Sequence, residues 1–380
     1  MKRTLCLMII LALLGSAAAQ AEPLRDGELA IKAPYAVLME KETGELLYEK
    51  GAHERVLPAS VTKVMTLLLL VEDIESGKIS VSDTVTASAR AASFGGSCVY
   101  LEEGERMSVD DMLKCIAVVS ANDCAVAMAE HVSGSEEVFV ARMNARAAEL
   151  GMEDTHFTNC TGLFEDPEHY TSAYDVAIMS RELIRHELIK NYTTIWMDTI
   201  RDGAFGLSNT NKLVYWYAGC TGLKTGYTSQ AMYCLSATAE RDGNEFIAVV
   251  MHSESIESRN ADAKALLNYA FANFALSPLP DAASLPAVPV EYGRGAELPL
   301  RIVSPSRFVL TKKGLGGCEF SCELPASVAA PVAEGECVGE LRVTLGGEEI
   351  AVFPLEAAAG VERIGFGGIL ARLAGSLFGL

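Results

Sequence analysis

Residues 58–63 read Pro-Ala-Ser-Val-Thr-Lys, and the chain that follows is apolar for most of three turns, including residues 67–71. This pattern predicts a buried central helix that begins at Ser60 and ends near Ser76. Ser60 and Lys63 are three residues apart, so their side chains lie on one face of that helix. A serine hydroxyl is a weak nucleophile without a base, and a neutral lysine can be that base where burial lowers its pKa. The segment therefore predicts an active serine with a lysine base.

A second motif, Ser120-Ala121-Asn122, falls at a predicted break between two helices. Such a break can aim two short polar side chains into a cleft. Ser120 would then relay a proton between Lys63 and a leaving amine, and Asn122 would hold Lys63 and a substrate amide. Simple capping of the following helix is the alternative for both residues.

A third motif, Lys224-Thr225-Gly226, is predicted to lie on a strand at the edge of a sheet. Gly226 has no side chain, so another backbone can approach it closely, and a substrate could pair with this strand. Lys224 and Thr225 would offer a cation and a hydroxyl group to a carboxylate, and the Lys224 charge would help to lower the pKa of Lys63. The backbone N–H groups of Ser60 and Tyr227 would form an oxyanion hole. A turn with a surface lysine is the alternative.

Periodicity predicts the elements around these motifs. A strand–turn–strand unit precedes the serine, helices fill residues 108–151 and 172–186, and a hairpin spans residues 233–252. A helix over residues 258–274 closes this part of the chain. The predicted organisation is a signal peptide over 1–21, a catalytic domain over 22–275, a Pro-rich linker over 276–289, a small β-rich domain over 290–357 and an amphipathic helix over 358–380.

Charge and cysteine content narrow the function classes. The 380 residues carry a formal net charge of −19 without a basic run, which argues against nucleic acid as a partner. The predicted leader implies export, and the C-terminal helix predicts attachment at the outer face of the cytoplasmic membrane, with a helix packed on the β domain as the alternative. Nine cysteines follow the leader, and an odd number leaves at least one unpaired. Cys318, Cys322 and Cys337 lack ordinary zinc spacing, so we expect no metal site.

The three motifs in this order resemble those of the serine-type D-Ala-D-Ala carboxypeptidases, the low-molecular-mass penicillin-binding proteins. Further matching segments are residues 93–97, 155–157, 161–163 and 169–175. The resemblance covers residues 30–275 closely and implies an α/β (α+β) penicillin-recognising serine transpeptidase/β-lactamase-like domain with a helical subdomain. Arg259 stands where the family places an arginine that meets the terminal carboxylate of the substrate.

The resemblance implies a D-alanyl-D-alanine carboxypeptidase that uses no cofactor. Such an enzyme removes the terminal D-Ala from peptidoglycan pentapeptide stems through an acyl-enzyme on Ser60, and β-lactams inhibit it by acylating the same serine. An endopeptidase acting on cross-links stays open. A class A-like β-lactamase is an alternative from the same fold and needs a glutamate that activates water, for which Glu165 and Glu168 lie in the broad region. A non-catalytic, membrane-tethered wall-binding protein is the third hypothesis.

Overall fold

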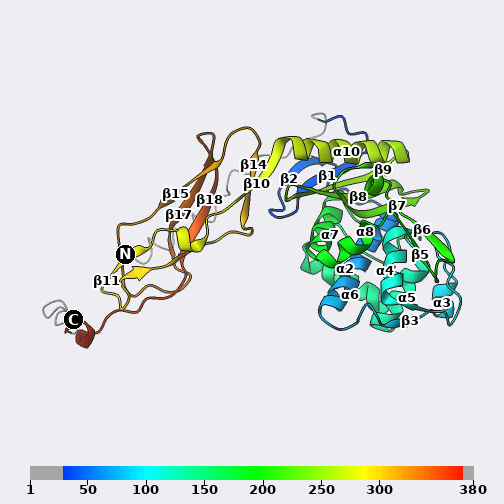
Figure 1. Ribbon diagram of the computed structural model, residues 1–380, viewed down its shortest axis with the longest axis horizontal. Helices are drawn as coiled ribbons and strands as arrows, with labels where there is room; N and C mark the ends of the chain where they lie inside the picture. Colours follow the sequence, from blue (N-terminus) through cyan, green and yellow to red (C-terminus); the bar gives the residue numbers. More distant parts are fainter. Residues whose placement is uncertain (1–28, 371–380) are drawn as a thin grey trace. The chain divides into compact units, whose positions relative to one another are not determined.

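The structure is a computed structural model that describes residues 29–370. The chain divides into two compact units, one ending at Asn273 and the other beginning at Phe274. The predicted signal peptide lies outside the described residues, and so do residues 371–380 of the predicted C-terminal helix. Figure 1 labels the elements of both units.

A five-stranded antiparallel sheet forms one layer of the first unit, with strand order β2-β1-β9-β8-β7. Its strands are β1 (Tyr35–Glu40), β2 (Leu46–Lys50), β7 (Cys220–Thr228), β8 (Met232–Arg241) and β9 (Asn244–Ser253). The predicted hairpin is confirmed as β8 and β9, joined by Asp242 and Gly243, which both have positive φ, as a tight two-residue turn requires. β7 is an edge strand.

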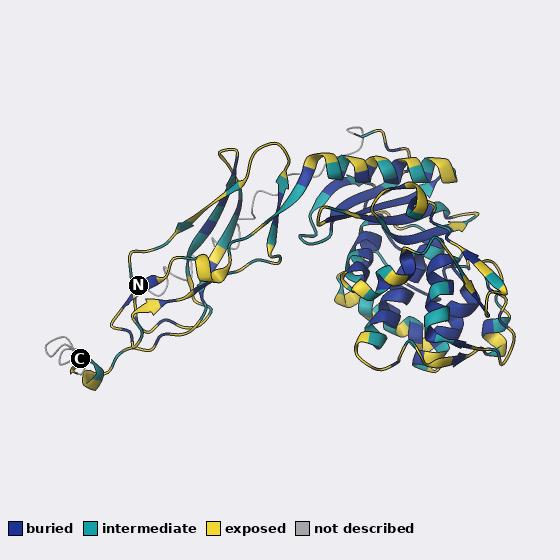
Figure 2. Cartoon of the chain, viewed as in Figure 1, coloured by how far each residue is buried: buried dark blue, intermediate teal, exposed yellow. Residues whose placement is uncertain are grey.

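Helices cover both faces of this sheet, as Figure 1 shows. α10 (Ile256–Asn273) packs on one face against β8 and β9, while α7 (Ala173–Arg185) packs on the other against β1 and β9. The 3-10 helix η1 (Ala59–Thr62) leads into α2 (Lys63–Glu75), which is buried from Lys63 to Val71 and packs against α7. This is the predicted central helix, dark blue over most of its length in Figure 2.

The remaining helices and strands of this unit form the helical subdomain and its connections. They are β3 (Thr84–Thr86), α3 (Ala89–Ala92), β4 (Arg106–Ser108), α4 (Val109–Val118), α5 (Asn122–Ser133), α6 (Glu136–Glu149), η2 (Glu187–Ile189), α8 (Lys190–Thr193), β5 (Met197–Ile200), β6 (Phe205–Ser208) and α9 (Leu213–Trp216). Ser108, Ser135 and Ser172 each accept a hydrogen bond from a backbone N–H three residues on. These side-chain caps explain why α4, α6 and α7 begin where the sequence predicts.

The second unit is built from short strands around its own apolar core. Its elements are β10 (Phe274–Pro278), η3 (Ala282–Ser284), β11 (Val288–Glu291), β12 (Glu297–Leu298), β13 (Leu300–Ile302), β14 (Phe308–Lys312), β15 (Cys318–Glu323), β16 (Val328–Ala329), β17 (Cys337–Leu345) and β18 (Glu348–Ala357). The largest sheet has the order β13-β18-β17-β15. All nine cysteines of the described residues are free thiols.

Two predicted boundaries differ from the structure. The stretch predicted as a linker, residues 276–289, holds most of β10, which pairs with β14, and the start of β11. The predicted tail helix does not begin at residue 358, because Val361 is buried in the β core and bridges Val332. Helical backbone begins at residue 366. The proline content and the apolar spacing led to the wrong boundaries, because pairing partners 29 to 38 residues away leave no local pattern in the sequence.

Candidate active site

Ser60 and Lys63 meet at the start of the central helix. Lys63 Nζ lies 3.0 Å from Ser60 Oγ, which is within hydrogen-bond reach. The Lys63 side chain is fully buried, and burial lowers its pKa to about 7, against the weaker opposing influence of Cys160, Cys98 and Asp123. A lysine with this pKa is substantially neutral at physiological pH, so its amine can accept a proton.

Two further oxygen atoms fix the Lys63 amine. Nζ donates to Asn122 Oδ1 at 2.6 Å and to the Thr161 carbonyl at 2.9 Å. Together with the contact to Ser60 Oγ, these hydrogen bonds hold the Lys63 side chain in one conformation. The amine is therefore preorganised beside the nucleophile.

The predicted break at Ser120-Ala121-Asn122 separates α4 from α5. Ser120 has φ of 65°, an uncommon backbone conformation for a residue with a side chain, and its buried Oγ has no hydrogen-bond partner among the described residues. Asn122 Nδ2 donates to the Gly95 carbonyl at 2.8 Å while its oxygen faces Lys63. Neither side chain caps α5, whose N-cap is Ala121. Capping, the alternative explanation of this motif, is therefore wrong.

Lys224 and Thr225 lie on the edge strand β7, as predicted. Lys224 is buried, and its Nζ donates to the Thr225 carbonyl at 2.8 Å. Burial lowers the Lys224 pKa well below its usual range, and the charges of Lys63 and Arg259 lower it further. β7 packs against η1 and α2, and the charge of Lys63 acts on Lys224, so the two lysines lie in one site. The surface-lysine alternative is wrong.

Gly226 lies against the backbone that carries the nucleophile. A Cβ atom here would stand 2.9 Å from the Pro58 carbonyl oxygen and 3.1 Å from the Ser60 nitrogen. Only glycine allows this approach without a shift of the backbone. The next residue, Tyr227, is exposed, and its ring lies 4.5 Å from that of Tyr233.

Arg259 lies in the first turn of α10 and is 4% exposed. Its guanidinium donates to Asn260 Oδ1 at 3.2 Å. Burial lowers its pKa, and its charge lowers the pKa of Lys224. Because α10 packs against β8, the strand that pairs with β7, the predicted residue lies near the β7 motif.

Sequence reasoning missed a buried support beneath the serine. His169 Nδ1 accepts from the Thr158 N–H at 3.0 Å, so Nε2 carries the proton and donates to Thr62 Oγ1 at 2.8 Å. Thr62 Oγ1 in turn donates to the Ala59 carbonyl. This chain of hydrogen bonds fixes η1, and burial lowers the His169 pKa to about 4. The signals in the sequence were Thr62 at the helix start and the family-like segment 169–175, which begins at His169, but neither indicates that the two side chains meet.

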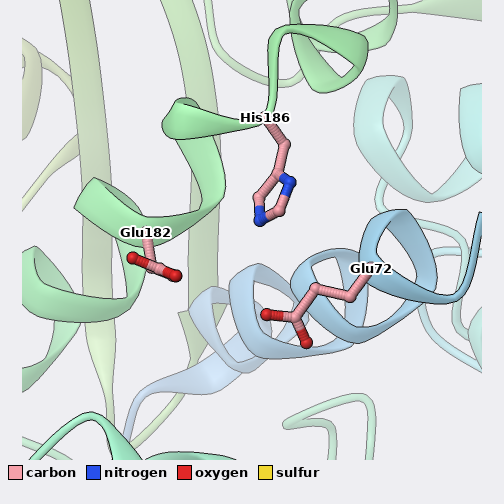
Figure 3. A group of neighbouring side chains, drawn as sticks. All are labelled: Glu72, Glu182 and His186. Atoms are coloured by element: carbon pink, nitrogen blue, oxygen red, sulfur yellow. The ribbon is translucent and has the colours of Figure 1, made fainter. Parts of the chain in front are cut away.

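One group of potential metal ligands occurs among residues 29–370, and it lies outside the site. Figure 3 shows its members, Glu72 of α2, Glu182 of α7 and His186. Arg146 Nη2 bridges the two carboxylates at 2.8 and 2.9 Å, and His186 Nδ1 faces Glu75. The group is an ion-pair network that ties α6 to α2 and α7.

The architecture and the site together define a penicillin-recognising serine hydrolase with a C-terminal β domain. The D-alanyl-D-alanine carboxypeptidase family matches residues 18–255, and the penicillin-binding protein 5 C-terminal domain matches residues 280–363. The chain belongs to the D-alanyl-D-alanine carboxypeptidase family of serine peptidases.

Individual relatives agree over nearly the whole length. The chain is 42% identical to D-alanyl-D-alanine carboxypeptidase DacF of Bacillus subtilis, over 99% of this chain and 98% of the relative. It is 30% identical to DacD of Escherichia coli, over 98% of each. Penicillin-binding protein 5 of Haemophilus influenzae superposes with a TM-score of 0.80 at 31% identity, covering 88% of this chain and 98% of that one.

Proposed function

We propose that this chain removes the terminal D-Ala from peptidoglycan pentapeptide stems through an acyl-enzyme on Ser60. The observation that carries the proposal is the buried Lys63 amine 3.0 Å from Ser60 Oγ with a pKa of about 7. Family membership supplies the substrate class, and the geometry supports the assignment of roles.

In the acylation step, Lys63 Nζ takes the Ser60 proton and Oγ attacks the carbonyl carbon of the penultimate D-Ala. The developing oxyanion lies between the N–H groups of Ser60 and Tyr227, which is where hydrogen bonds lower the barrier most. The C–N bond then breaks, and Ser120 passes the proton from Lys63 to the leaving amine. Within residues 29–370, the Ser120 Oγ has no hydrogen-bond partner that would compete with this task.

The residues that bind the substrate in this proposal lie on β7 and α10. The stem peptide adds to the open edge of β7, and its terminal carboxylate faces Lys224, Thr225 and Arg259. Two buried basic side chains and a hydroxyl group can bind a carboxylate, whose negative charge in turn favours the protonated form of Lys224. In deacylation, water attacks the ester carbon and gives a proton to Lys63. The C–Oγ bond then breaks and Lys63 returns that proton to Oγ, which regenerates Ser60 and releases the shortened peptide as a carboxylate.

Benzylpenicillin tests the proposal directly. Intact-mass analysis should show a stable adduct of one drug mass that is absent in Ser60→Ala, and the unmodified enzyme should release D-Ala from a pentapeptide. Consumption of the drug without an adduct would favour the β-lactamase; an intact drug and no adduct would favour the non-catalytic wall-binding protein. Glu165, a glutamate that a β-lactamase could use, is only partly exposed and accepts hydrogen bonds from Ser229 and Gln230 instead.

We further propose that the enzyme is exported and held at the outer face of the cytoplasmic membrane by its C-terminal segment. No helix within residues 29–370 is long and apolar enough to cross a bilayer. The described start of the segment exposes Phe366, Ile369 and Leu370, which suits a helix lying in the interface.

A further inference from the structure

Three aromatic rings lie side by side in the segment that precedes β7, and two of them are exposed. Trp196 and Tyr215 have ring centroids 5.1 Å apart, and Tyr215 and Trp216 have centroids 4.7 Å apart. Tyr215 is 59% exposed and Trp216 is 71% exposed. We call Trp196, Tyr215 and Trp216 the aromatic platform. Single exposed apolar residues are ordinary on a soluble protein, but a joined set of large rings marks a binding surface.

The buried Asn209 and the exposed Lys212 hold the part of the platform that carries Trp196. Asn209 donates from its side chain to the Ile195 carbonyl at 2.7 Å and from its backbone to the Trp196 carbonyl at 2.9 Å. Lys212 Nζ binds the Asn209 carbonyl and rests 4.7 Å above the Trp196 ring. Rings fixed in this way lose little conformational entropy on binding, so their contact area converts efficiently into affinity.

The platform is continuous with the substrate site. Thr210, next to Asn209, accepts a hydrogen bond at 2.9 Å from Thr225 Oγ1 of the β7 motif. Asn211 donates to the Gly222 carbonyl of the same strand, and α9, which carries two of the rings, packs against β7. A polymer whose peptide branch lies along β7 would therefore pass close to these rings.

The chemistry of the aromatic platform indicates which kind of polymer it binds. Pyranose rings present a flat face of C–H groups edged by hydroxyl groups, and such faces stack on aromatic rings. An anionic membrane surface is a poor match, because Lys212 is the one cation that the described residues place over these rings and the whole chain carries −19.

We propose that the aromatic platform binds the glycan strand to which the stem peptide is attached. The assignment rests on the proposed function, since that function places a peptidoglycan stem on β7. The platform would make the enzyme prefer stems on polymeric wall over free peptides.

The test uses Trp216→Ala and Tyr215→Ala, with Tyr292→Ala as the matched control because Tyr292 is an equally exposed ring in the β unit. Binding is measured by co-sedimentation with insoluble peptidoglycan in a Ser60→Ala background, where no acyl-enzyme forms. Both platform variants should bind about tenfold more weakly, as expected for loss of one stacked ring, and the control should not. With Ser60 present, all variants should keep kcat/KM on a free pentapeptide within about twofold of the unmodified chain.

Three further outcomes separate the alternatives. Peptidoglycan stripped of stems by an amidase should still be retained by the platform, and loss of retention there would overturn the proposal in favour of peptide contacts. Trp216-dependent binding to anionic vesicles, with unchanged wall binding, would overturn it in favour of a lipid surface. If the unmodified chain fails to cleave the free pentapeptide while Trp216→Ala still weakens wall binding, the proposed function fails and the glycan site stands.

Discussion

At the scale of single residues, the pKa of Lys63 sets the pH dependence of acylation. Because its pKa is lowered to about 7, the amine is protonated and inactive below that pH and becomes a base above it. The acylation rate with benzylpenicillin should rise about tenfold per pH unit below pH 7 and level off above it. Stopped-flow measurement of acylation between pH 5 and 9 checks this.

Lys63→Arg is the informative control for that profile. A guanidinium stays protonated throughout the range, so acylation should fall by a factor of about 10² or more at every pH, without a rise near 7. A Lys63→Arg profile that kept the same midpoint would mean that another group is the base.

Gly226 offers a second residue-scale prediction. Gly226→Ala would place a methyl carbon 2.9 Å from the Pro58 oxygen and 3.1 Å from the Ser60 nitrogen, displacing one N–H of the oxyanion hole. Acylation should slow by about 10²-fold. Gly206→Ala is the matched control, because a Cβ atom there meets nothing within 4 Å, and it should acylate normally. Equal rates for both variants would remove the Ser60 N–H from the mechanism.

At the scale of elements, the hydrogen bonds through His169 couple the stability of η1 to pH. The folded-state pKa of about 4 is below the ordinary value of 6.5, so the unfolded chain binds more protons between these values. The contribution of the neutral His169 to the free energy of unfolding is therefore fully present above pH 6.5. It is lost as the pH falls to 4, which lowers the free energy of unfolding by about 3 kcal/mol.

His169→Gln isolates this effect because glutamine can offer an acceptor and a donor without titrating. Urea unfolding of the catalytic unit at pH 4, 5, 6 and 7, followed by circular dichroism, should show a flatter pH dependence for the variant. Parallel curves for the two proteins would show that His169 does not titrate in this window.

The helices and strands also show which features of the fold can be predicted from the sequence. The caps Ser108, Ser135 and Ser172 and the β8–β9 turn act within a few residues, so they could be predicted. The catalytic motifs could be predicted because each carries its chemistry in three or six consecutive residues. The Thr62–His169 contact joins positions 107 residues apart, and no local pattern encodes such a pairing. For the same reason, β10 could not be predicted within its Pro-rich stretch.

At the scale of the whole molecule, the boundary of the β unit decides how to test the membrane anchor. Val361 lies in the β core, Arg363 bridges Gly293 and the Ile364 N–H donates to the Tyr292 carbonyl, so truncation must fall after residue 364 to leave this unit intact. The chain lacking residues 365–380 should no longer sediment with anionic vesicles, because its apolar helical segment is gone. D-Ala release from a free pentapeptide should stay within about twofold, since the site lies in the other unit. Unchanged sedimentation would rule out this segment as the anchor.

The open edge of β7 has one more consequence. A strand edge that can receive a peptide can equally receive a strand of another copy of the same chain, which is a common route to aggregation. Here the edge carries a buried lysine at position 224 and an irregular register between Cys220 and Gly222. Charged side chains that point inward and bulged strands are features by which natural sheets resist such pairing. The lysine that we assign to substrate recognition would therefore also keep copies of the enzyme apart.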